Sequence, residues 1–400
     1  MRVALVSWEY PPLVVGGLAA HVHGLATAMA RAGHEVVVLT RAHPYAPDDS
    51  EVEGVRVLRA HVDLPWVPND NPLAQVISGN HQVAQLGARL LPWQADVVHA
   101  HDWLGAWAGD TLREAYGAPF VATIHATELG RHQGHLTSTT SEAINASEWW
   151  LTYEAQHVIC CSGFMVEEVV RSFQLPRDKI TMVPNGVDPS RFRTDGVTRA
   201  PADSPLIVSW GRLEYEKGFQ TLIAAVARLV ARHPALRCVL VGRGSYSEEL
   251  RGVARGLGVE QSVQFAGFVS DEELVRLLNE ATCAVIPSLY EPFGIVALEA
   301  LSAGAPLIAA ESGGLREVLS GTDAGLLFPP GNADALAGAF DRMLSEPGLV
   351  EQCQRAGTQL VETRYSWDAI AASTVDVYEQ AGARSTKKPT KKGKGSVRSR

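Results

Sequence analysis

Long hydrophobic runs are missing from this chain of 400 residues. No segment approaches the roughly 18 apolar residues that a membrane-spanning helix needs, and the most apolar stretches have only the length of strands. The first residues, MRVALVSWEYPP, hold one basic side chain and a very short apolar run, which is not the pattern of a signal peptide. We therefore predict a cytoplasmic protein without an integral membrane segment.

Cysteines are also scarce, and none forms a C-x-x-C pair. The five positions are Cys160, Cys161, Cys238, Cys283 and Cys353. A disulfide framework or a structural zinc site requires paired or clustered cysteines. The pattern favours free, buried thiols in a reducing compartment.

Basic residues are few in most of the chain. The net charge is −9, with 35 Lys and Arg against 44 Asp and Glu. Because eight of the basic residues lie in 384–400, residues 1–383 carry a balance of −17. An acidic body argues against binding of nucleic acid, which depends on phosphate neutralisation by Lys and Arg. We expect 384–400 to be a disordered basic tail that catalysis does not need.

What the chain does have is a regular alternation of strand-sized apolar runs and helix-period segments. In the first half, strands are predicted at 2–7, 35–39, 55–60, 96–100, 120–124, 157–161 and 179–183. In the second half, they are predicted at 206–210, 238–242, 263–265, 283–286, 306–309 and 325–328. A loop-rich stretch near 185–205 separates the two series. This predicts an α/β fold with two doubly wound Rossmann-like domains, over 1–190 and 191–365, that face each other across a cleft.

Candidate site residues are those that directly follow strands, because ligands of open α/β sheets bind at the carboxyl ends of the strands. Gly16 and Gly17 follow the first strand and precede a helix expected over 18–32. Paired glycines at a helix start let a backbone approach a phosphate or sugar, and a simple tight turn is the alternative. The lack of G-x-G-x-x-G weighs against a dinucleotide oxidoreductase.

Histidines and acids follow two further strands of the first half. His99 and His101 could be metal ligands, but no third ligand stands at a convincing spacing, so a polar strand-end site is favoured. Asp102 is a second candidate, or only the N-cap of a helix. His125 lies in a segment rich in ionisable residues after the next strand, which favours a site.

The second half offers groups suited to phosphate. Arg212 and Lys217 lie on the turn after its first strand, where Arg would be a bidentate donor and Lys a point charge. Surface ion pairing with Glu214 or Glu216 is the alternative. Gly242 follows the next strand in a Gly-Arg-Gly turn.

Glu291 and Glu299 frame a third motif. We expect Pro292 to stand in the first turn of a helix, which puts the two glutamate backbones roughly 9–12 Å apart at a rise of 1.5 Å per residue. This is too far for the roughly 5 Å carboxyl pair of a double-displacement glycosidase. Two contacts on one elongated ligand fit better.

Together these motifs resemble the retaining family 4 glycosyltransferases of the GT-B fold. The resemblance is carried by G-R-L-x-x-x-K-G at 211–218, E-x7-E at 291–299 and P-N-G-V-D at 184–188. The segments at 7–12, 99–103 and 123–128 are similar to those of glycogen- and starch-synthase-like actinobacterial α-1,4-glucosyltransferases. Val14-Val15 stand where the glycogen synthases carry Lys-x before the two glycines, which leaves the donor nucleotide open.

The resemblance implies a role for each matching residue. Arg212 and Lys217 would hold the diphosphate, Glu299 the ribose, and Glu291 the donor sugar; His125 would lie at the anomeric centre, and Asp102 near the sugar or acceptor. The implied catalytic residues are His125, Asp102 and Glu291. The implied donor-binding residues are Gly16, Gly17, Arg212, Lys217, Gly242, Glu291, Phe293, Gly294, Ile295 and Glu299. A last helix at about 366–383 would cross back onto the first domain, and neither a metal nor a cofactor would be needed.

The expected reaction moves glucose from UDP- or ADP-glucose to the non-reducing end of an α-1,4-glucan or related polysaccharide on the same face of the sugar. Alternatives are a lipid or small polyol acceptor, a nucleotide-sugar epimerase, and a binding module without turnover. Trp149-Trp150 and the segment 90–93 leave a peripheral membrane contact open, although core or acceptor-site packing is favoured. The oligomeric state is not predicted.

Overall fold

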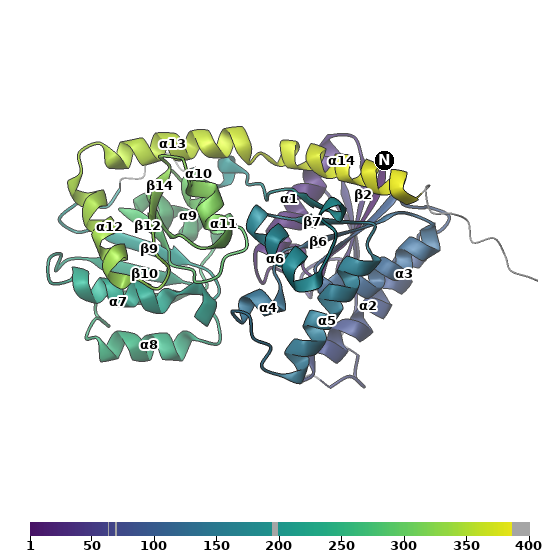
Figure 1. Ribbon diagram of the computed structural model, residues 1–400, viewed down its shortest axis with the longest axis horizontal. Coiled ribbons are helices and arrows are strands. Elements are labelled where there is room, and N and C mark those ends of the chain that lie inside the picture. Colours follow the sequence, from purple (N-terminus) through teal and green to yellow (C-terminus); the bar gives the residue numbers. More distant parts are fainter. Residues whose placement is uncertain (63, 69, 194–198, 386–400) are drawn as a thin grey trace, which may run out of the picture.

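The computed structural model describes residues 1–400 except 63, 69, 194–198 and 386–400, so most of the basic tail lies outside the described residues. The described chain forms two α/β lobes, each built around one sheet, which is wholly parallel in the C-terminal lobe and parallel except for one edge strand in the N-terminal lobe (Figure 1). This is the arrangement of two Rossmann-like domains that the alternating pattern predicts.

The N-terminal lobe holds an eight-stranded sheet in the order β3-β4-β2-β1-β5-β6-β7-β8. Its strands are β1 (Arg2–Val6), β2 (Glu35–Arg41), β3 (Asp49–Val52), β4 (Val55–Ala60), β5 (Val97–His101), β6 (Phe120–Ile124), β7 (His157–Cys160) and β8 (Ile180–Met182). Its helices are α1 (Gly17–Arg31), α2 (Pro72–Ala88), α3 (Ala106–Tyr116), α4 (Glu128–Arg131), α5 (Thr139–Glu154) and α6 (Gly163–Phe173). The seven predicted strands are present. The prediction missed β3, an antiparallel partner of β4, because its largely exposed D-S-E-V sequence has no apolar run.

The C-terminal lobe holds a six-stranded parallel sheet in the order β11-β10-β9-β12-β13-β14. Its strands are β9 (Leu206–Trp210), β10 (Arg237–Val241), β11 (Val263–Gly267), β12 (Cys283–Ile286), β13 (Leu307–Ala310) and β14 (Gly325–Phe328). Its helices are α7 (Phe219–Leu229), α8 (Ser247–Gly256), α9 (Asp271–Glu280), α10 (Ile295–Ser302), α11 (Gly313–Leu319), α12 (Ala333–Ser345) and α13 (Leu349–Arg364). All six predicted strands are present.

The last described helix, α14 (Trp367–Ser385), leaves the C-terminal lobe and packs on α1 of the N-terminal lobe (Figure 1). Arg31 pairs with Asp368 at 2.7 Å on the surface of this contact. At its buried side, the Tyr378 hydroxyl lies 2.8 Å from Nδ1 of His99 on β5. The chain therefore returns to the first sheet with a polar anchor inside an apolar interface.

The central strands of both sheets are buried, as near-continuous apolar sequences require in sheets that carry helices on both faces. All five cysteines are free and buried, as predicted. None of the helices formed by the described residues is long and apolar enough to cross a membrane. Most of the candidate site residues lie in the segments that directly follow the carboxyl ends of strands.

Candidate active site

The N-termini of two helices meet between the lobes. Helix α1 begins at Gly17 and α10 begins at Ile295. A Cβ atom added to Gly17 would lie 3.0 Å from Cδ1 of Ile295, so the two helix starts touch. Free N–H groups and the positive ends of two helix dipoles thus converge from opposite lobes, an arrangement that favours an anion.

The loop before α1 is fixed by Glu9. Its carboxylate accepts hydrogen bonds from the backbone N–H groups of Val15 at 2.9 Å and Gly16 at 3.1 Å. Glu9, which is largely buried, therefore fixes the loop that carries the glycine pair predicted to approach the donor.

Lys217 and Glu291 form the central ion pair of the C-terminal lobe. The Lys217 Nζ lies 2.7 Å from Glu291 Oε2, and Ser288 Oγ donates to the same oxygen at 3.2 Å. Arg212 is more exposed and pairs with Glu216 at 3.5 Å, which is one of the two alternative pairings considered from the sequence. Lys217 instead points to the residue predicted to orient the donor sugar.

The expected position of Pro292 is wrong. Helix α10 begins only at Ile295, with Gly294 as its N-cap at φ +96°, so Pro292 lies in the preceding loop. Gly294 is required there because its backbone is left-handed and an added Cβ would lie 2.5 Å from Leu315. Glu291 is thus outside the helix, and Glu299 is in its second turn, so the separation estimated from one continuous helix does not apply.

Three more residues predicted to bind the donor are Glu299, Phe293 and Gly242. Glu299 accepts a hydrogen bond from the Trp210 indole at 2.8 Å, and burial raises the pKa of its carboxyl. Phe293 is buried next to Glu291. Gly242 packs directly against the turn after β9, where an added Cβ would lie 1.9 Å from the Gly211 carbonyl oxygen.

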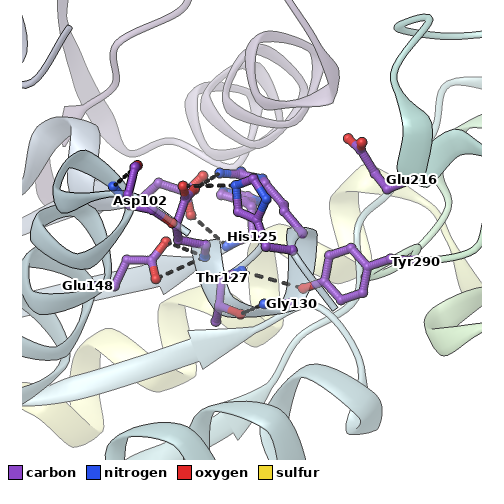
Figure 2. A network of polar contacts seen from close by, with 12 residues as sticks. Asp102, His125, Thr127, Gly130, Glu148, Glu216 and Tyr290 are labelled. Carbon is purple, nitrogen blue, oxygen red and sulfur yellow. Dashed lines mark hydrogen bonds and ion pairs between the residues drawn. The ribbon is translucent and has the colours of Figure 1, made fainter. Parts of the chain in front are cut away.

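Asp102 and His125 meet at the carboxyl ends of β5 and β6. Asp102 Oδ1 accepts a hydrogen bond from the backbone N–H of His125 at 2.7 Å, and the aspartate does not cap the turn that follows it (Figure 2). Burial raises the pKa of Asp102 to about 6 and lowers the pKa of His125 to about 3. His125 is therefore neutral at physiological pH.

Two further histidines lie behind His125. His101 Nδ1 is 3.2 Å from His125 Nε2, and the His21 ring from α1 packs edge-on against His125 with ring centroids 4.6 Å apart. His99 does not join them as a ligand, because its two ring nitrogens contact Tyr378 and Thr123. The metal pair considered from the sequence, His99 with His101, is thus not formed.

Among the described residues, His21, His101 and His125 are the group with the spacing to hold a metal ion, with ligand atoms within 4.8 Å of one another. Tetrahedral zinc with Zn–N distances of about 2.0–2.1 Å brings its ligand nitrogens closer together than that. The three rings would have to draw inward to bind one.

Sequence reasoning missed a buried acid, Glu148, which contacts the chain shortly after β6. Glu148 on α5 accepts two hydrogen bonds from the backbone N–H of Glu128, at 2.9 and 3.0 Å (Figure 2). Burial raises its pKa to about 8, with Arg131 opposing the shift. Nothing in the pattern of α5 signals this role. His21, by contrast, stands beside the apolar positions of α1 and could have been suspected.

Of the tryptophans considered for membrane contact, two are packed against other side chains and one is exposed. Trp150 stacks on Trp107 and Trp93 packs edge-on against Tyr116, so both serve packing. Trp149 is 47% exposed and stacks on the exposed ring of Tyr153.

Two family models cover most of the chain. The one described as Glycosyltransferase Family 4 matches residues 15–191, and the one described as Glycosyl transferases group 1 matches residues 190–360.

Relatives and solved structures extend the match to nearly full length. The chain is 39% identical to a glycogen synthase of Mycobacterium tuberculosis, over 94% of each chain. It is 32% identical to a D-inositol 3-phosphate glycosyltransferase of Actinosynnema mirum, over 95% of this chain and 97% of that one. The structure of a sucrose-phosphate synthase from Thermosynechococcus elongatus superposes with a TM-score of 0.82 at 28% identity, covering 96% of this chain and 99% of that one. The chain therefore belongs to the GT-B glycosyltransferases, with a family 4 domain followed by a group 1 domain.

Proposed function

We propose that this protein is a retaining glycosyltransferase that moves glucose from UDP- or ADP-glucose to the non-reducing end of an α-1,4-glucan or related polysaccharide. The observation that carries the proposal is the position of the Lys217–Glu291 pair. It lies beside the start of α10, and the N-terminus of α1 contacts that helix start from the other lobe. A cation, two helix N-termini and a sugar-orienting acid are thus gathered at one point between the lobes.

This arrangement suits a nucleoside diphosphate as the leaving group. Negative charge grows on the diphosphate as the glycosidic bond breaks, and preorganised donors stabilise it. Lys217 and Arg212 would exchange their present carboxylate partners for phosphate oxygens. Glu291, released from Lys217, would then accept hydrogen bonds from the hydroxyl groups of the donor sugar.

A same-face substitution needs no carboxylate nucleophile, and this agrees with the hydrogen bonds that the acids of the site already make. Glu291 is bound to Lys217 and Ser288, and Asp102 is bound to the backbone of His125, so neither stands free as a nucleophile. The leaving phosphate would accept the proton of the acceptor hydroxyl, and no metal or cofactor would take part. Neutral His125, partly exposed at the end of β6, would border the anomeric carbon.

The glucan acceptor is supported by the 39% identity with a glycogen synthase. A small polyol acceptor is the second candidate, favoured by the 32% identity with a D-inositol 3-phosphate glycosyltransferase. A lipid acceptor has less support, because only one tryptophan of the pair at 149–150 is exposed. Five free, buried cysteines fit our proposal of a cytoplasmic enzyme.

The test is a panel of UDP-, ADP- and GDP-sugars against maltooligosaccharides and inositol phosphates, in the presence of EDTA. Elongation of maltooligosaccharides from a glucose donor, with an α-linkage seen by NMR, is the expected result. Transfer only of mannose or N-acetylglucosamine, or activity that is lost with EDTA, would contradict the proposal. Conversion of the donor without any acceptor would indicate an epimerase, and tight binding without turnover a binding module.

A further inference from the structure

The Tyr290 hydroxyl joins the two lobes beside the candidate site. Tyr290 lies in the loop between β12 and α10, and its hydroxyl donates to Glu168 Oε1 on α6 of the N-terminal lobe at 2.8 Å. The backbone N–H of Thr127 points at the same hydroxyl at 3.4 Å, and Thr127 Oγ1 donates to the same Glu168 oxygen at 2.5 Å. Figure 2 shows the Tyr290 ring reaching from one lobe to the Thr127 loop of the other.

This junction is sealed from water. Thr127, Glu168 and Tyr290 are 0%, 5% and 7% exposed. When the lobes separate, the tyrosine hydroxyl and the glutamate lose partners that only water can replace. A buried network of this kind favours one arrangement of the lobes over all others, because a partner left unpaired in a dry site is costly.

Gly130 provides the space that the tyrosine fills. An added Cβ at this position would lie 2.3 Å from the Tyr290 hydroxyl oxygen and 2.6 Å from Glu168 Oε1. The φ of Gly130 is not in the left-handed region, so close approach rather than backbone conformation requires glycine here. The Gly130 N–H also donates to Thr127 Oγ1 at 2.9 Å, which fixes the loop that receives the ring.

Both ends of the junction stand next to residues of the proposed reaction. Tyr290 immediately precedes Glu291, and Thr127 is two residues after His125. We propose that Tyr290 is a positioning residue whose hydroxyl sets the distance between Glu291 and His125 by fixing how the lobes close. This inference rests on the proposed glycosyl transfer for its kinetic consequence, but not for its structural one.

Two neighbouring contacts extend the same interface. Ser162 Oγ donates to the Pro292 carbonyl oxygen at 2.6 Å, and Glu317 of α11 accepts from the backbone N–H of Gly163 at 2.8 Å. These contacts hold the first turn of α6 against the C-terminal lobe. They do not touch the Thr127 loop, so Glu317→Gln serves as an interface control.

The experiment uses Tyr290→Phe, which keeps the ring and removes the hydroxyl. Spin labels at Glu114→Cys and Glu248→Cys, exposed positions on opposite lobes, report the interlobe distance by pulsed electron resonance. We expect a broader distribution shifted to longer distances than in the parent, together with a fall in kcat of about 10- to 100-fold. The KM for the nucleotide sugar should change much less than kcat, because Arg212 and Lys217 are untouched.

Gly130→Ala tests the inference by a different route, because it blocks the ring without removing a polar group. It should shift the distance distribution in the same direction, whereas Tyr153→Phe, an exposed tyrosine, should leave distance and rate unchanged. In Glu317→Gln any opening should carry a smaller loss of kcat than in Tyr290→Phe. Parent-like distances in both Tyr290→Phe and Gly130→Ala would overturn the inference. If both variants show longer interlobe distances but the parent protein transfers sugar from no donor, the proposed function is contradicted. The structural role of Tyr290 in fixing the lobes would still hold.

Discussion

The Lys217 ammonium lies 2.7 Å from the Glu291 carboxylate and connects two turns that are 74 residues apart in the chain. The side chains are 21% and 10% exposed, so the pair is neither a free surface contact nor a sealed core pair. A polar ligand can therefore reach it and compete for both partners.

Lys217→Ala should lower kcat/KM by about 10²- to 10³-fold, because one preorganised charge at the leaving diphosphate is lost. Glu291→Ala should lose most activity as well, and both variants should remain folded by circular dichroism. Arg228→Ala, which removes an exposed ion pair with Asp334 in the same lobe, is the matched control and should keep parental kinetics. Equal loss in the control would show that the effect is general.

Asp102→Asn should retain more activity than Asp102→Ala, because an amide oxygen can still accept the hydrogen bond of the His125 backbone. Burial raises the pKa of Asp102 to about 6, so the parent carboxylate takes up a proton as the pH falls through 6. We expect an acidic limb near that pH in the rate profile of the parent and its absence in Asp102→Asn. The same limb in both proteins would contradict this assignment.

Glu148→Gln should change how stability depends on pH. Because burial raises the pKa of Glu148 from 4.5 to about 8, the native protein binds this proton more tightly than the unfolded chain does. Its contribution to stability is fully present below pH 4.5 and is lost as the pH rises through 8. Thermal melts from pH 5 to 9 should show a shallower decline for Glu148→Gln than for the parent, and parallel curves would refute the prediction.

Tyr378→Phe should weaken the docking of α14 on the N-terminal lobe. The hydroxyl is buried against His99 Nδ1, and removing one partner of a buried hydrogen bond costs about 1–3 kcal/mol. Urea unfolding should show this loss, with kcat reduced much less than in Lys217→Ala, because the Tyr378 hydroxyl contacts His99 and not a residue predicted to bind the donor. Tyr153→Phe, an exposed substitution, should leave the unfolding midpoint where it is.

The fold was largely predictable because both sheets are parallel and buried, which makes their strands continuous apolar runs. The exception is β3, whose exposed antiparallel pairing leaves no such signal. The predicted start of α10 is wrong for a different reason. Pro292 is compatible with a first helical turn, but the left-handed backbone of Gly294 delays the helix to Ile295.

The sequence by itself determined the two α/β domains and the residue types at strand ends that suit an anionic donor, because strand periodicity and motif spacing are local properties. Only the tertiary structure decided which of those residues meet. It paired Lys217 with Glu291, directed Asp102 to the backbone of His125 and placed Tyr290 against Glu168. These contacts join residues from 23 to 122 positions apart, and their geometry depends on how two sheets and two lobes pack, which no local pattern encodes.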